Sequence, residues 1–201
     1  MKKILFSLAA IAAFGIGQAQ EETTASGFSK GDVFVSGSLG YSSQKTGEAK
    51  ATRFGVVPRV GYFVSEKIAI GAQLGYSSVA EDYFNGLDWS ESKTSSFIAG
   101  AFARYYCTPG KTFSFFGQLH ANYVTSKTEP SSGEEYKRNG FEAGLAPGIS
   151  YFVSDHFALE TTFGLLGYGT SKPDADGAES TDTFNLNLDL TAVTFGIIYK
   201  F

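Results

Sequence analysis

Thr191–Phe201 reads T-A-V-T-F-G-I-I-Y-K-F, and it is the last stretch of the chain. Every second residue in it is apolar or aromatic: Val193, Phe195, Ile197, Tyr199 and Phe201. Alternation with a period of two is typical of a β-strand that has one apolar face. A strand at the very end of a chain must still pair on both edges. We therefore expect it to close a β-barrel, with its apolar face directed outward into lipid.

The same alternation recurs upstream and predicts eight strands in all. They cover roughly residues 32–42, 51–64, 68–78, 95–106, 112–125, 139–153, 157–169 and 183–201. The connections after the second, fourth and sixth strands are tight turns, and the others are longer polar loops. With both termini on one side, all turns lie on that side and all loops on the other, as in outer-membrane barrels. The alternation changes phase near Leu190-Thr191, which predicts a β-bulge or bend there.

An internal repeat supports this division of the chain. Residues 58–70, P-R-V-G-Y-F-V-S-E-K-I-A-I, match residues 147–159, P-G-I-S-Y-F-V-S-D-H-F-A-L, at a constant offset of 89. The two segments are predicted to be equivalent hairpins, so the barrel would consist of four hairpins.

Composition agrees with curved sheet and excludes some classes of protein. The chain has 24 Gly, 19 Phe and 11 Tyr among 201 residues. Its mean hydropathy is only −0.05, as expected when lipid-facing and lumen-facing residues average out. The single Cys107 excludes an intrachain disulfide, and we assign it no role. Without Lys2 and Lys3 the balance is 14 basic to 20 acidic residues, a charge of −6, which argues against a nucleic-acid partner.

The first 19 residues have the pattern of a secretory signal peptide. Lys2 and Lys3 precede the apolar run Ile4–Ile16, and Gly17-Gln18-Ala19 supplies small residues for cleavage. The apolar run is shorter than the ~20 residues that a membrane-spanning helix needs. We therefore predict a signal peptide over 1–19, a loose periplasmic lead-in over 20–30 and one barrel domain over 31–201.

At three places the chain resembles the small outer-membrane β-barrels of the OmpA/OmpX type, the porin-family "outer membrane protein beta-barrel domain". These places are Pro58–Gly71, Phe102–Tyr106 and Phe195–Phe201, and the resemblance covers about residues 28–201. It implies an all-β, eight-stranded, antiparallel, up-and-down transmembrane barrel in the outer membrane, surrounded by lipid and lipopolysaccharide. The ending Tyr199-Lys200-Phe201 is similar to the signal that the barrel-assembly machinery recognises. Phe195, Ile197, Tyr199 and Phe201 would form that assembly signal.

The residues predicted to face inward include several charges. They are Asp32, Arg53, Arg59, Arg104, His120, Glu142 and Glu160. An eight-stranded barrel is only wide enough for side chains to fill it, so such charges must pair. We interpret them as a structural charge network that plugs the lumen; the alternative is a proton or ion path. A soluble lipocalin-like barrel would instead place its charges outward and its aliphatic residues inward.

No catalytic, cofactor or metal site is expected. His120 is assigned inward and His156 to a turn, and neither has an outward Ser and acid at matching height. Asp174-x-Asp176-Gly177 matches only a fragment of a calcium loop. We expect a structural barrel that presents extracellular loops, for envelope integrity or contact with an unknown surface ligand. The alternative is a narrow porin-like channel for small solutes or ions.

Overall fold

The computed structural model describes residues 27–84, 88–131, 133–175 and 177–201. For Trp89, Leu165 and residues 187–193 the structure describes the backbone alone. The predicted signal peptide lies outside the described residues. Within the described part, no helix has the length and apolar character needed to cross a bilayer.

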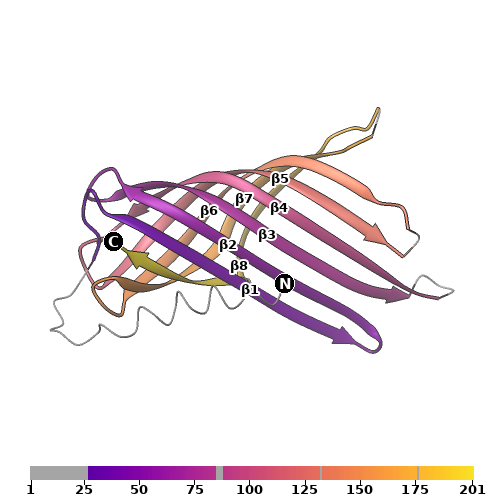
Figure 1. Ribbon diagram of the computed structural model, residues 1–201, viewed down its shortest axis with the longest axis horizontal. Helices are drawn as coiled ribbons and strands as arrows, with labels where there is room; N and C mark the ends of the chain where they lie inside the picture. Colours follow the sequence, from indigo (N-terminus) through magenta and orange to yellow (C-terminus); the bar gives the residue numbers. More distant parts are fainter. Residues whose placement is uncertain (1–26, 85–87, 132, 176) are drawn as a thin grey trace.

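The chain forms one closed antiparallel barrel in which each strand pairs with the next and β8 pairs with β1 (Figure 1). The strands are β1 (Val33–Thr46), β2 (Ala49–Phe63), β3 (Ile68–Phe84), β4 (Trp89–Tyr106), β5 (Phe113–Pro130), β6 (Tyr136–Phe152), β7 (Phe157–Pro173) and β8 (Thr181–Lys200). The predicted all-β, eight-stranded, up-and-down barrel is therefore confirmed.

The predicted long loops are mostly strand, and this is a correction. Residues 79–94 were expected to be a loop, but β3 and β4 stay paired as far as Phe84 and Trp89. Likewise, β5 and β6 remain paired up to Thr128 and Tyr136. Polar side chains in these segments mark where the sheet leaves the apolar zone, while backbone pairing continues into water. The result is a set of long hairpins rather than long loops, at the end opposite the C-terminus (Figure 1).

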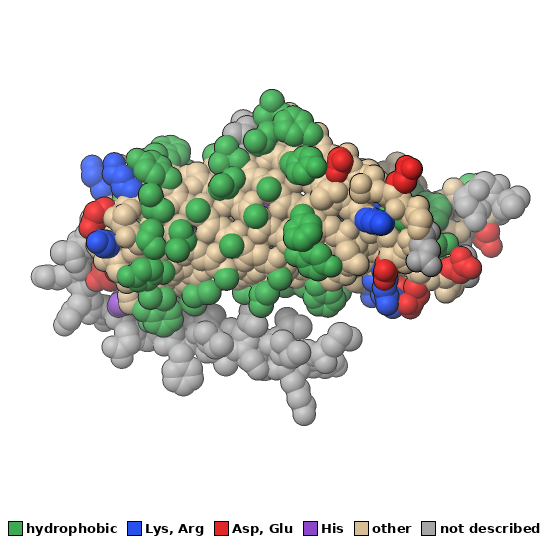
Figure 2. Space-filling model, turned by 90° about the horizontal axis from the view of Figure 1, so that it is seen from above, with side chains coloured by type: hydrophobic (Ala, Val, Ile, Leu, Met, Phe, Trp, Pro, Cys, Tyr) green, Lys and Arg blue, Asp and Glu red, His purple; other side chains and the backbone are tan. Residues whose placement is uncertain are grey.

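The outer wall is apolar, as the alternation predicts. Val33, Val35, Leu39 and Tyr41 of β1 are 40–69% exposed, whereas Phe34, Ser36 and Ser38 between them are buried. Figure 2 shows hydrophobic side chains spread over the middle of the molecule and charged ones gathered at its two ends. This is the reverse of a lipocalin-like barrel, and it is what a lipid-facing wall requires.

The predicted irregularity in β8 is confirmed. Thr162 of β7 pairs with Thr194, but four residues further along, Leu166 pairs with Leu186. β8 thus has four more residues than β7 over this interval, which encloses Leu190-Thr191. A smaller register shift, not predicted, lies between β6 and β7 at Leu145–Gly148. Before this shift the odd-numbered residue Leu159 of β7 faces outward, and after it the even-numbered Leu166 and Tyr168 are exposed instead.

The pairing that closes the barrel is much shorter than the others. β1 pairs with β8 only over Phe34–Leu39, although it pairs with β2 along its full length, as far as Thr46. Above Leu39, both faces of β1 are exposed or partly exposed. In Figure 1 the β1–β2 hairpin and the β7–β8 hairpin diverge at the end opposite the C-terminus.

The core lies inside the barrel, at the end where the tight turns are. Its buried apolar residues are Phe28, Phe34, Phe63, Ala69, Phe102, Tyr106, Phe116, Phe152, Ala158 and Ile198. Phe28 belongs to the segment predicted to be a loose lead-in, yet it is only 1% exposed. Its ring lies 4.6 Å from that of Phe63 and 4.8 Å from that of Phe152. The described end of the lead-in is therefore not loose, because Phe28 fills the turn-side mouth of the barrel.

Two contacts fasten this segment. The Phe28 amide donates to the Pro109 carbonyl (2.7 Å), and Lys200 Nζ donates to the Gly27 carbonyl (2.7 Å). A Cβ on Gly27 would lie 2.2 Å from the Pro109 oxygen, so only glycine fits this close approach. The entering chain and the last strand thus hold each other at one end of the lumen.

Candidate functional site

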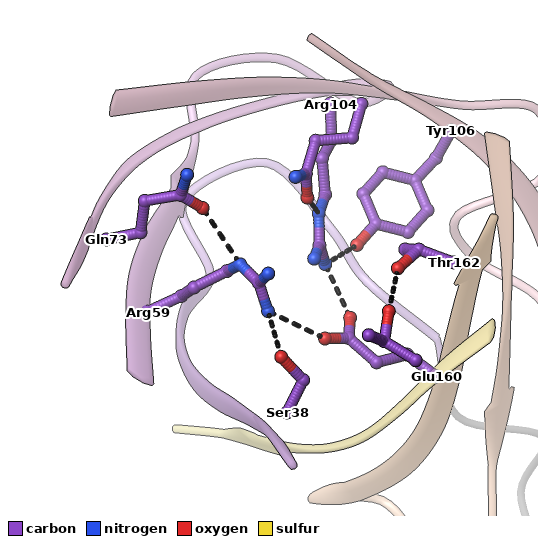
Figure 3. Close-up of polar contacts among 9 residues, drawn as sticks. Ser38, Arg59, Gln73, Arg104, Tyr106, Glu160 and Thr162 are labelled. Atoms are coloured by element: carbon purple, nitrogen blue, oxygen red, sulfur yellow. Dashed lines mark hydrogen bonds and ion pairs between the residues drawn. The ribbon is translucent and has the colours of Figure 1, made fainter. Parts of the chain in front are cut away.

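The inward polar residues form a connected network next to the aromatic core, on the side of the long hairpins. Its centre is Glu160 of β7, whose side chain is 2% exposed. Glu160 Oε2 accepts from Arg104 Nη1 at 2.7 Å, and its Oε1 lies 3.7 Å from Arg59 Nη1. One buried carboxylate therefore joins two guanidinium groups that come from β2 and β4 (Figure 3).

Arg104 is enclosed more completely than any other ionised group in the network. Its Nε donates to Gln118 Oε1 (2.7 Å) and its Nη1 to the Tyr106 hydroxyl (3.1 Å). The guanidinium carbon lies 4.6 Å from the centre of the Phe116 ring and 5.2 Å from that of Phe102. Ring faces attract cations, so Arg104 connects the aromatic core to the charge network.

A chain of side-chain hydrogen bonds continues across the lumen from Arg59. Arg59 donates to Gln73 Oε1 (3.0 Å) and to the Ser38 hydroxyl (3.2 Å). Gln73 Nε2 donates to Asn122 Oδ1 (2.6 Å), and Asn122 Nδ2 donates to Glu142 Oε1 (2.8 Å). The bonded groups come from five strands, β1, β2, β3, β5 and β6, so they form a polar layer across the barrel.

Glycines leave room for this layer. A Cβ on Gly100 would lie 2.1 Å from Asn122 Oδ1, and one on Gly196 would lie 2.9 Å from Glu160 Cγ. Both positions face inward, next to the bulky network residues. Their lack of a side chain allows the Asn and Glu to cross the lumen.

Three of the seven predicted network residues meet at one point, where Glu160 contacts both Arg59 and Arg104. Glu142 is connected to them only through Asn122 and Gln73. Arg53 lies apart, in the extended part of β2, where it pairs with Glu81 at 2.8 Å and is half exposed. Asp32 lies at the mouth and accepts from the Ser29 amide (2.9 Å), with Lys200 Nζ at 3.8 Å.

His120 and the C-terminal residues complete the predicted set. His120 faces inward opposite Gly144, and its Nδ1 is buried without a hydrogen-bond partner among the described residues. Phe195, Ile197 and Phe201 are 57–69% exposed on the outer wall. The Tyr199 ring lies 4.9 Å from that of Phe201 and 5.0 Å from that of Phe157. The outward row of β8 therefore ends in an aromatic cluster.

Comparison with known proteins fits this architecture. The model of the family described as "Outer membrane protein beta-barrel domain" matches residues 6–201. The chain belongs to this family. It is an outer-membrane protein that crosses the bilayer with its β-strands, and the expected resemblance is confirmed.

Solved structures also match the chain. The outer membrane protein OprG from Pseudomonas aeruginosa shares 17% sequence identity with a TM-score of 0.55, covering 87% of this chain and 98% of OprG. A major outer membrane protein from Thermus thermophilus matches at 13% identity and a TM-score of 0.48, over 85% of this chain and 98% of its own. At such identities the likeness to OprG concerns the fold alone. No curated protein matched the chain.

Sequence reasoning missed several members of this outer-membrane barrel's interior. Gln73, Gln118 and Asn122 connect the charges, but they were not assigned to the network. Tyr106 and Phe28 were not assigned to the core. The available signal was the inward phase itself, because polar and aromatic residues on that phase near the tight turns must fill the lumen.

No group of three His, Cys, Asp or Glu that could hold a metal occurs among the described residues, and Asp176 of the calcium-like fragment is outside them.

Proposed function

We propose that this outer-membrane barrel is a structural and surface protein whose lumen is closed and whose long hairpins are presented outside the cell. The observation that carries the proposal is the double closure of the turn-side half of the lumen. An aromatic layer sealed by Phe28 lies below a hydrogen-bonded layer centred on Arg104 and Glu160. A path for ions would have to break both layers.

The exposed hairpins supply the surface part of the proposal. Beyond the apolar wall, β3–β4 and β5–β6 continue as paired strands that carry mixed charges. Lys127 Nζ contacts Glu129 at 2.8 Å and Glu135 at 2.6 Å, which ties the tip of the β5–β6 hairpin together. A paired hairpin is stiffer than a free loop and can present a defined surface to lipopolysaccharide or to a ligand. We propose no catalytic role.

Conductance separates this function from that of a channel. The purified protein, reconstituted in a planar bilayer, is expected to give no reproducible current steps at neutral pH. A Phe28→Ala, Glu160→Gln double variant removes one member of each closing layer and serves as a positive comparison. Discrete steps from the wild-type protein would favour the alternative, a narrow porin-like channel.

The processing and assembly steps are part of the same proposal. We expect a signal peptidase to remove residues 1–19 and the barrel-assembly machinery to recognise Phe195, Ile197, Tyr199 and Phe201. The outward exposure of Phe195, Ile197 and Phe201 and the aromatic contacts of Tyr199 support the second step. Phe201→Ala is expected to lower the amount of folded barrel in the outer membrane, measured as the heat-modifiable band on a gel. An unchanged amount would remove Phe201 from the signal.

A further inference from the structure

The lumen contains a cavity above the hydrogen-bonded layer, on the side of the hairpins. Its volume is about 230 Å³, and it is lined from β5, β6, β7 and β8. The lining residues that matter here are Ser126, Arg138, Glu142, Gly169, Ser171 and Thr183. Its turn side is closed, among the described residues, by Asn122 and Glu142, which are hydrogen-bonded to each other, and we call this cavity the blind pit.

Two opposite charges line this pit, and the described residues supply a counter-ion to neither. Glu142 lies at the bottom, where its carboxylate accepts from Asn122 through Oε1. Arg138 lies at the rim, where its Nη2 donates to the Ser171 hydroxyl at 3.0 Å. Among the described residues, neither side chain has an oppositely charged group within ion-pair distance. Deeper in the lumen, by contrast, Glu160 lies within ion-pair distance of both Arg104 and Arg59.

Glycines on the neighbouring strand β7 leave space beside Glu142. Gly169 of β7 faces Glu142 in the β6–β7 ladder, and Gly167 faces Gly144. A Cβ added to Gly167 would meet no atom within 4 Å, and one added to Gly169 would meet only the Phe141 carbonyl oxygen, at 3.8 Å. Among the side chains that the structure describes, none fills the space next to Gly167 and Gly169 on the β7 side of Glu142.

The spacing of the two charges defines the ligand. Arg138 and Glu142 are four residues apart on one strand, which separates their Cα atoms by about 13 Å. Both side chains are long enough to shorten the gap between the charged groups. A ligand that satisfies both must carry a cation and an anion separated by several bonds. Its ammonium group would contact Glu142 at the bottom of the pit, and its carboxylate would contact Arg138 at the rim. The Ser171 and Thr183 hydroxyls also line the pit.

We infer that this pit is a binding site for a small, extended zwitterion, such as a linear ω-amino acid or a very short peptide. Glu142 binds the ammonium group, and Arg138 binds the carboxylate. The inference goes beyond the proposed function, since a blind pit can bind a solute whether or not the barrel conducts.

The probe is 6-aminohexanoate, titrated into the purified full-length mature barrel in detergent and followed by calorimetry. We expect saturable binding that is at least 10-fold tighter than the binding of glycine, hexylamine or hexanoate. Glycine has both charges at the wrong spacing, and the other two have one charge each. Equal weak binding of hexylamine and 6-aminohexanoate, or no saturable binding of 6-aminohexanoate, would overturn the inference.

Variants test the assignment of the residues. Glu142→Gln and Arg138→Gln are each expected to weaken 6-aminohexanoate binding at least 10-fold. Arg53→Gln is the matched control, because Arg53 is also a cation at the hairpin end but already pairs with Glu81. Gly169→Leu fills the pit without removing a charge and is expected to abolish binding. Folding of every variant is checked by heat-modifiable mobility, and full binding by folded Gly169→Leu would contradict the proposed site.

Discussion

Glu160→Gln tests the charge network at its centre. The substitution keeps the size of the side chain and one hydrogen-bond acceptor, but it removes the negative charge shared by Arg59 and Arg104. At an effective dielectric constant of ~20, a charge pair at 2.7 Å attracts by about 6 kcal/mol and one at 3.7 Å by about 4.5 kcal/mol. These attractions offset the burial of three charges, so the net effect is smaller. Removing one partner of a buried pair costs about 3–5 kcal/mol.

We expect a loss of about 3 kcal/mol in the free energy of unfolding, at the lower end because glutamine can still accept a hydrogen bond. The assay is reversible urea unfolding of the barrel in lipid vesicles, followed by tryptophan fluorescence and gel mobility. Glu81→Gln is the matched control, because Glu81 also pairs with an arginine at 2.8 Å but is half exposed. Its loss should be below about 1 kcal/mol. Equal losses for the two variants would refute the argument that burial gives this network its weight.

Three further predictions concern other parts of the barrel. Phe28→Ala should cost about 3 kcal/mol in the same unfolding assay, whereas Lys30→Ala, an exposed neighbour, should cost almost nothing. The hydrogen bond from Lys127 lowers the pKa of the Glu129 carboxyl, so this pair supports its hairpin fully above about pH 4.3 and loses that support as the pH falls further. The protection factors of amides near Glu129, which correct for the intrinsic exchange rate, should therefore fall at pH 3 in the wild-type protein and not in Glu129→Gln. A protease site inserted at Gly47, at the tip of the β1–β2 hairpin, should be cut in intact cells, and protection there would reverse the assigned orientation.

The architecture could be predicted because apolar residues alternate with small or polar ones along each strand, and this alternation assigns the lipid-facing side of the barrel. The alternation Phe195, Ile197, Tyr199 is enough to assign the outward face of β8, and the same rule assigns the other strands. The phase change near Leu190 correctly indicated a local irregularity. Strand ends could not be predicted, because the polar segments of β3–β4 and β5–β6 continue as paired strands beyond the apolar wall, and their composition resembles that of loops. Sequence polarity therefore marks the edge of the membrane, not the end of a hairpin.

The interior was only partly predictable. Arg59, Arg104 and Glu160 share the inward phase and similar heights, but the phase alone does not say which charges touch. Arg53 also has that phase, yet it pairs outside the core because Glu81 stands beside it on the extended β3. Phe28 was missed because it is a lone aromatic in a polar segment, where no alternation exists. Its position depends on tertiary contacts with Phe63 and Phe152.

Because the pairing between β1 and β8 is short, the barrel does not resist strand separation equally around its circumference. The ladder to β8 pairs only Phe34–Leu39 of β1, with one further hydrogen bond from the Phe201 amide to the Val33 carbonyl. The other ladders run nearly the length of their strands. Under tension, or when detergent loosens the assembly, separation should begin at this junction and spread around the circumference one hairpin at a time. During insertion into the membrane, β1 and β8 would be the last pair of strands to form hydrogen bonds. The hydrogen bond from Lys200 to the Gly27 carbonyl then links β8 to the segment that precedes β1 in the closed barrel.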